Sequence, residues 1–319
     1  MTTAGATQTT SQATPLGAPP SRACHQWAFA LWLVSLLLFY RPLAGLANLS
    51  LHDDNSSHLL VIPILSAIMV WIERKRVFRN ARYSPIGLML LLAVLLLWCG
   101  FRILPIPSAD RLSVDAALLV LTWIAIFVLC YGAGSFKAAV FPLLYLGLMI
   151  PIPAAATYRL ISFLQRSSAD TSYVLFRLLG IPVLRHGFVF SLPGIDLEVA
   201  RECSGIRSAL SLFIAGLLAA HFVLPSAWRK IWFVAAILPI AIFKNAVRIV
   251  TLAWLGIYVN PAVFQSKLHR QGGVPFSIIA LALMFVLLWV LRRPGQIPGG
   301  ASADAAGPRL GIMQNSKPN

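Results

Sequence analysis

Apolar stretches long enough to cross a membrane recur along this chain, and they restrict its fold more than any other feature. Each is close to the length that a helix needs to span about 30 Å of hydrocarbon. Eight such stretches lie near residues 27–48, 57–72, 84–103, 113–131, 137–152, 204–224, 228–257 and 275–291. Of the 319 residues, 58% are hydrophobic and only 11% are charged, which excludes a soluble domain with one core. The sequence therefore predicts an all-α polytopic membrane protein with eight transmembrane helices.

The two ends of the chain differ in composition from this membrane region. Residues 1–22 are rich in Thr, Ala, Ser, Gly and Pro, and residues 294–319 are rich in Gly, Pro and Ala. Both are expected to be disordered tails, because they contain too little apolar surface to bury. Residues 23–293 are expected to form one transmembrane domain. The apolar run from Trp27 is long enough to remain as a helix, so we do not expect a cleaved signal peptide.

Basic residues in short loops predict the orientation, because cytoplasmic loops of membrane proteins carry an excess of Lys and Arg. The basic positions are "ERKRVFRNAR" at 73–82, Lys137, "SAWRK" at 226–230 and "LRRPG" at 291–295. All fall on one side of an eight-helix chain whose N- and C-termini both lie inside. This asymmetry accounts for most of the net charge of +16, for which anionic membrane lipid is the expected counter-surface. Nucleic acid is not expected as a partner, since the chain has no soluble basic domain.

The same orientation places the segments 49–57, 153–203 and 258–274 on the outer side. Between Tyr158 and Leu179 the apolar residues are spaced as on an amphipathic helix that lies in the membrane interface. The stretch "FVFSLPGIDLEVA" then alternates like a β-strand, and its Pro193-Gly194 pair is typical of a turn. We therefore expect a small outer-face helix and a β-hairpin before the sixth transmembrane helix.

The hairpin leads directly into "ARECSGIRS", in which Cys203 stands where the 204–224 helix is expected to begin. The positive end of a helix and Arg207 one turn further would both favour a thiolate there. Ser204 and Gly205 are small and would let a substrate backbone approach the sulfur. The alternative is a small buried hydrophobic residue.

The other three cysteines fit that alternative, since Cys24 lies in the tail and Cys99 and Cys130 lie in apolar runs. Four cysteines scattered in this way indicate no disulfide framework and no metal cluster, and no cofactor is expected.

A second polar group lies inside the seventh span, in "FKNAVRIVT" at 243–251. Asn245, Arg248 and Thr251 follow one another at helical spacing, and Lys244 lies one turn from Arg248. Charged residues in membrane spans are costly and usually face the bundle interior or a wet cavity. A structural buried ion pair is the alternative, but the spans contain almost no carboxylates. We therefore expect a functional role for Arg248.

Two histidines are expected on the outer side. His269 precedes the eighth span in "SKLHRQGGVPF", where two glycines and a proline would bend the chain back toward the bundle. His58 opens the second span and is either a supporting residue or an ordinary interface histidine. A cysteine, an arginine and a histidine on one side of the membrane supply the parts needed for thiolate attack on a carbonyl.

The order of these motifs resembles the exosortase/archaeosortase family. The matching stretches are "DNSSHLLVIPILSAIMVW", "VFPLLYLGLMIPIP", "GIPVLRHGFVFSLPGIDLEVARECSGIRSALSL", "FKNAVRIVTLAWLGIYVN" and "LHRQGGVPFS". They cover roughly residues 53–291 and leave out both tails. The resemblance implies Cys203, Arg248 and His269 as the catalytic residues. The histidine at position 269 favours the bacterial exosortase branch over the archaeal one, which is expected to carry arginine there.

The resemblance further implies a cysteine transpeptidase or protease in the bacterial cytoplasmic membrane, with its active site on the outer face. Its substrates would be secreted proteins that end in a short sorting motif, one transmembrane helix and a basic tail, such as PEP-CTERM signals. Cleavage would leave a thioester on Cys203, and transfer to an acceptor would release or anchor the product. The family is often linked to exopolysaccharide export.

Two other readings of the same residues remain open. A membrane acyltransferase would use the same thiolate to carry a fatty acyl chain, and the adduct on Cys203 would distinguish the two enzymes. An anion transporter could use Arg248 and Lys244, although it would usually show inverted repeats, which this chain lacks.

Overall fold

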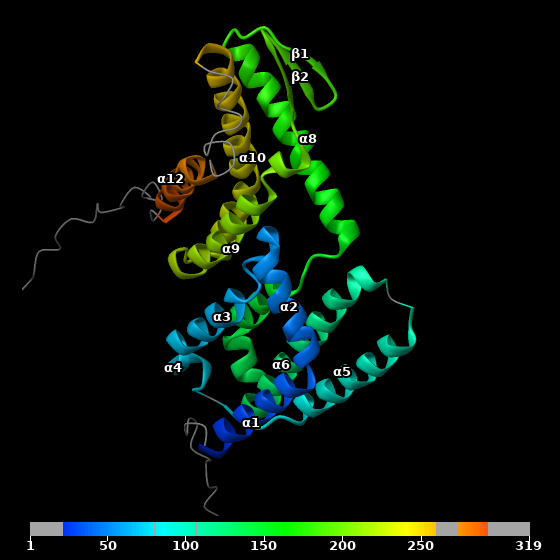
Figure 1. The fold of residues 1–319 in the computed structure, drawn as a ribbon. Coiled ribbons are helices and arrows are strands. Elements are labelled where there is room, and N and C mark those ends of the chain that lie inside the picture. The colour runs from blue at the N-terminus through cyan, green and yellow to red at the C-terminus, as the bar shows by residue number, and fades with distance from the viewer. Residues whose placement is uncertain (1–21, 80, 106, 260–272, 293–319) are drawn as a thin grey trace, which may run out of the picture.

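The computed structural model describes residues 22–79, 81–105, 107–259 and 273–292, and most of them are helical. The elements run in this order: α1 Arg22–Leu38, α2 Tyr40–His52, η1 Asp54–Ser56, α3 Val61–Ile72, α4 Arg74–Val77, α5 Pro85–Ile103, α6 Ser108–Ala138, α7 Val140–Tyr145, η2 Leu146–Met149, α8 Ala154–Leu178, β1 Leu184–His186, β2 Val189–Leu192, β3 Ile195–Glu198, η3 Arg201–Ser204, α9 Ile206–Val223, α10 Ala227–Tyr258 and α12 Gly273–Arg292. Figure 1 shows α1–α7 gathered at one end of the molecule, and α8, α10 and the sheet at the other.

The first group of helices packs around α6. Its core consists of buried apolar side chains from α1 to α7, such as Leu46, Ile62 and Phe127, and α9 adds Ile214 and Leu217 at its edge. Helix α5 contacts α6 on one side and otherwise exposes leucines, as expected of a helix that faces lipid.

Helix α6 is broken at Gly132, whose φ of 81° is not helical. The break leaves backbone carbonyls without helical partners, and the segment before α5 supplies donors. The backbone N–H of Arg82 donates to Tyr131 O at 3.1 Å, and that of Ser84 donates to Leu129 O at 3.1 Å. A Cβ atom at Gly132 would lie 2.5 Å from Arg82 O, so only glycine fits this break.

The second group contains two apolar clusters. One joins α9, α10 and α12, and its packing is tight because a Cβ atom at Gly216 would lie 2.4 Å from Ile237 Cδ1. The other joins α8 and the sheet to the last turns of α10 through Phe176, Phe190 and Val250. Helix α10 is therefore the shared element of this half of the molecule (Figure 1).

The eight-span count is not confirmed. Five of the described helices are long and apolar enough to cross a membrane, or seven if each of two bent pairs counts as one span. The first predicted span is two helices, α1 and α2, that meet at 74°, and the fifth is α7 with η2, followed by α8 at 92°. The second predicted span is the 12-residue helix α3, which is only about 18 Å long. The predicted tails at 1–22 and 294–319 lie outside the described residues, apart from Arg22 in α1.

The predicted outer segment contains the expected elements. Helix α8 covers the predicted 158–179 helix, and Pro193-Gly194 makes the turn between β2 and β3, where Gly194 has φ 81°. The hairpin gains a third strand, since β1 pairs antiparallel with β2 around Gly187. Of the predicted apolar stripe, Leu164 is buried, while Val174 and Leu178 are exposed, as an interface helix would present them to lipid. Gln165, Ser168 and Ser172 of α8 are buried as well.

Helix α9 runs from the turn that contains Cys203 to the segment that contains Glu73. At its last turn, His221 Nε2 lies 2.6 Å from Glu73 Oε1, and the imidazole stacks on Phe141 with ring centroids 4.0 Å apart. Its first turn follows η3, which contains Cys203. The two turns are roughly 22 Å apart along the helix axis. The basic segment after Glu73 therefore lies at the end of α9 opposite to Cys203.

The break in α6 makes a stability prediction. Gly132→Ala should destabilise the protein by about 1–3 kcal/mol, because alanine is strained at positive φ and its methyl group would overlap Arg82 O. The measurement is the thermal unfolding midpoint in detergent. Gly100→Ala is the matched control, since a Cβ atom there meets nothing within 4 Å and alanine favours the helix. Equal midpoints for the two variants would contradict the argument.

Candidate active site

Cys203 lies in the 3₁₀ turn η3 and not in the helix that follows it. Gly205, with φ 77°, ends this turn in the left-handed conformation, and α9 begins at Ile206. The expectation that Arg207 lies one helical turn from Cys203 is therefore wrong, because the helical spacing does not extend back across Gly205. Arg207 is exposed at the start of α9. The Cys203 side chain lies outside the described residues.

The position of this turn is set by contact with α10. An added Cβ atom at Gly205 would lie 2.9 Å from Asn245 Cγ and 3.0 Å from Asn245 Oδ1. Asn245 is itself held from the other side, since its amide donates to Ser168 Oγ of α8 at 3.0 Å. Glycine at position 205 is thus required by the close approach of α10 and by its positive φ, in addition to any room that it leaves for a substrate.

A buried lysine on α10 supports the same turn. Lys244 is 1% exposed, and its ammonium donates a short hydrogen bond to Ser208 Oγ. Ser208 Oγ in turn donates to Gly205 O at 2.9 Å. The cation on α10 is therefore connected through one hydroxyl to the backbone carbonyl of Gly205, and Lys244 and Asn245 brace the turn together.

Two cations follow one another on this face of α10. Arg248 is half-buried one turn beyond Lys244, close enough for its guanidinium to repel the ammonium. None of the described carboxylates forms an ion pair with Lys244. Positive charge in a membrane helix is costly unless an anion offsets it. The arrangement therefore favours a negative charge beside the Cys203 turn.

The hydroxyl of Ser204 lies next to Cys203 in the same turn. The side chain is 2% exposed, and its oxygen has no hydrogen-bond partner among the described residues. A buried hydroxyl without a partner costs free energy, so a ligand group that bonds to it would be favoured.

Helix α8 supplies polar residues that the sequence analysis missed. Gln165 Nε2 donates to Val199 O at 2.6 Å and so ties α8 to the chain that enters η3. Ser168 bonds Asn245, and Ser172 Oγ donates to Ser168 O at 2.7 Å. These three residues recur at i, i+3 and i+7 in "QRSSADTS", a polar stripe of small side chains that signals close helix packing.

The structure describes one of the two predicted histidines, His58. His58 is half-buried in the turn between η1 and α3, and η1 packs against α9. Burial lowers the pKa of His58, while a hydrogen bond to the Asn55 backbone and the Asp53 carboxylate oppose that shift. His269 lies outside the described residues, so its placement near Cys203 stays a prediction.

The remaining cysteines differ in their burial and position. Cys130 is buried in α6 as expected, whereas Cys99 is exposed on α5 and Cys24 belongs to α1 rather than to a tail. Within the described ranges, no three His, Cys, Asp or Glu side chains gather as a metal site would require.

The lysine–serine contact makes a second stability prediction. Ser208→Ala should cost about 1–3 kcal/mol in the natural chain, because it removes the acceptor from a buried ammonium. In a Lys244→Met background the same change should cost clearly less, since no ammonium is left without a partner. Thermal midpoints of the four proteins in detergent give the coupling between the two sites. Equal costs in both backgrounds would show that the hydrogen bond has no energetic importance.

Comparison with known proteins identifies the family of the chain. The model of a family described as transmembrane exosortases matches residues 47–286, about three quarters of the chain. The match covers every described site residue, and it begins within α2 and ends within α12. Searches of curated proteins and of solved structures found no match. The chain belongs to the transmembrane exosortase family.

Proposed function

We propose that this protein is a membrane-embedded cysteine transpeptidase or protease that cleaves C-terminal sorting signals of secreted proteins through a thioester on Cys203. Membership of the exosortase family supports this proposal. The single observation that carries it further is the buried cation Lys244, linked through Ser208 to the turn that contains Cys203. A site that binds peptide and stabilises negative charge at a cysteine is suited to acyl transfer.

In the first step, the Cys203 thiolate attacks the carbonyl carbon of the scissile peptide bond. A C–S bond forms and the carbonyl electron pair moves to oxygen, where the guanidinium of Arg248 stabilises it with two hydrogen bonds. Arginine is suited to this role, because it keeps its charge where a lysine might lose its proton. The oxyanion then collapses, the C–N bond breaks, and the leaving amine takes a proton from His269.

In the second step, an acceptor nucleophile attacks the thioester. Its proton goes to His269, the C–S bond breaks, and the thiolate of Cys203 is restored. Water as acceptor would release the protein, and an amine or hydroxyl would anchor it. The backbone around Gly205 is held by Asn245 and by the Lys244–Ser208 pair, so we assign these residues to positioning the nucleophile. His58 and Arg207 are assigned supporting roles.

We further propose that Cys203 faces the outside of the bacterial cytoplasmic membrane. The basic segment after Glu73 lies at the opposite end of α9, and Lys and Arg prefer the cytoplasmic side. Substrates would then be secreted proteins with a sorting motif, a transmembrane helix and a basic tail, such as PEP-CTERM proteins.

The decisive measurement is the mass of the group attached to Cys203 in cells that also produce a candidate substrate. A peptide adduct, released by hydroxylamine, is expected for the transpeptidase, and a fatty acyl adduct would instead indicate a membrane acyltransferase. Cys203→Ala should abolish both the adduct and substrate cleavage and leave the protein in the membrane. The triple variant Cys24→Ala, Cys99→Ala, Cys130→Ala is the control and should stay active. Full cleavage by Cys203→Ala would end this proposal.

Arg248→Lys tests the oxyanion role. The variant should lose about 10²–10³ of its cleavage rate, because one preorganised donor to an oxyanion is worth about that much. Its thermal midpoint in detergent should stay close to that of the natural protein, since the positive charge is kept. The matched control is Arg177→Lys, which changes an exposed arginine in the last turn of α8 and should leave the cleavage rate unchanged. Equal activity of Arg248→Lys and the natural protein would return Arg248 to a structural role.

A further inference from the structure

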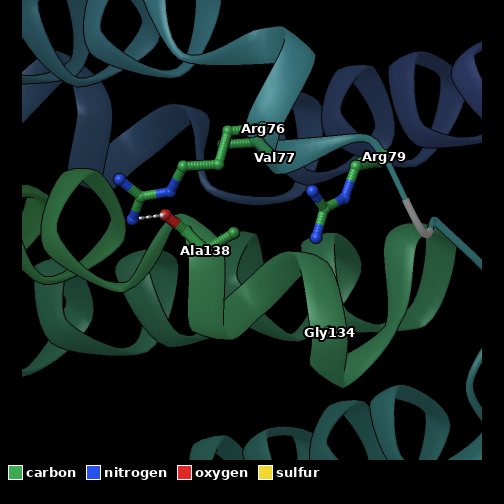
Figure 2. Close-up of a pocket in the computed structure, with 5 residues that line it drawn as sticks. All are labelled: Arg76, Val77, Arg79, Gly134 and Ala138. Carbon is green, nitrogen blue, oxygen red and sulfur yellow. Dashed lines mark hydrogen bonds between the residues drawn. The ribbon is translucent and has the colours of Figure 1, made fainter. Parts of the chain in front are cut away.

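A cavity lies at the end of the molecule opposite to Cys203, between α4 and the last turns of α6. Its volume is about 380 Å³, and it is lined by Arg76, Val77, Arg79, Gly134 and Ala138. Figure 2 shows both arginine side chains reaching from the α4 segment toward α6, with the glycine and the alanine forming the opposite wall. The cavity is separate from the candidate active site.

One of the two guanidinium groups is fixed and the other is available. Arg76 Nη2 donates to Ala138 O at 3.1 Å, and Arg76 Nη1 lies 3.6 Å from Glu73 Oε2. Glu73 also bonds His221 through its other oxygen, so one carboxylate is shared between two partners. Arg79 has no hydrogen bond or ion pair with any described residue and is exposed. The cavity therefore presents more positive than negative charge.

Room for a ligand exists because of Gly134. An added Cβ atom there would meet nothing within 4 Å, so the wall of α6 is open at this point. Val77 is 1% exposed and forms an apolar floor. A compact anion with several acceptor oxygens would fit between the two guanidinium forks, which are suited to phosphate.

The surroundings place this cavity where lipid headgroups lie. Trp71, at the end of α3, is 65% exposed, and the Arg74 guanidinium sits 4.5 Å from its ring centroid, an arrangement typical of a membrane interface. Ile86 and Met89, in the first turns of α5, are exposed and apolar. Helix α5 begins just after the segment that pairs with the break in α6, and Gly134 of the cavity lies two residues beyond that break.

We propose that this cavity binds the phosphate group of an anionic phospholipid, with the acyl chains lying along α5. Basic pockets between membrane helices bind anionic headgroups elsewhere by the same chemistry. The sequence predicted only that anionic lipid faces the basic segment as a whole. The structure assigns the contact to Arg76, Arg79 and the open wall at Gly134, and it predicts that other arginines of the same segment do not take part.

The test compares two arginines of one segment. The full-length protein is purified, placed in nanodiscs of neutral lipid, and titrated with phosphatidylglycerol while bound lipid is counted by native mass spectrometry. Arg79→Gln should weaken binding about tenfold, the loss expected for one charge-assisted phosphate contact. Arg74→Gln removes the same charge from the same segment but contacts Trp71 and not the cavity, so its binding should be unchanged.

Gly134→Leu is the second variant, because a leucine enters open space and fills the cavity without changing charge. It should weaken binding as Arg79→Gln does and keep the thermal midpoint measured in neutral lipid. Inorganic phosphate is added in a parallel arm and should not displace the lipid at equal concentration. Equal losses in Arg74→Gln and Arg79→Gln, or unchanged binding in Gly134→Leu, would show general surface attraction and overturn the site. Displacement by inorganic phosphate would overturn the lipid as its source.

Discussion

The close approach of Gly205 to Asn245 fixes the geometry around Cys203. A single methyl group at position 205 would overlap the amide, so the turn can occupy this place only with glycine there. Asn245 is held by Ser168, and Gly205 O accepts from Ser208, which itself receives a hydrogen bond from Lys244. The turn that contains Cys203 is therefore positioned by α8, α9 and α10 at once, and not by its own loop. Such positioning from rigid helices is what precise chemistry requires.

This bracing has an electrostatic consequence. Lys244 is buried, and Arg248 follows one turn later on the same helix. Two cations in a membrane span destabilise the empty protein and stabilise any state in which negative charge develops nearby. A thiolate and a tetrahedral oxyanion are both such states. Lys244, which helps to hold the turn, would thus also lower the energy of the charges that the proposed reaction creates.

Sequence patterns predicted which helices and turns form better than they predicted the directions in which the helices run. The membrane class, the helix at 158–179 and the Pro193-Gly194 turn followed from local patterns that hydropathy and turn chemistry determine. The family followed from the order of its motifs. The span count did not follow, because a run of apolar residues has a length but no direction, and the bends of 74° and 92° come from tertiary packing. The prediction that Arg207 lies one helical turn from Cys203 was wrong, because Gly205 is left-handed and interrupts the helix between them.

The polar face of α8 is predictable from the sequence, since Gln165, Ser168 and Ser172 share one face of the same helix that carries the apolar stripe. Its partners could not, because Ser168 meets Asn245 across 77 positions of the chain. In the middle of α9, the helix fits against α10 and α12 so closely that a Cβ atom at Gly216 would overlap Ile237. Helix α9 cannot shift without these neighbours. This packing therefore helps to fix the position of the turn before α9 relative to Lys244 on α10.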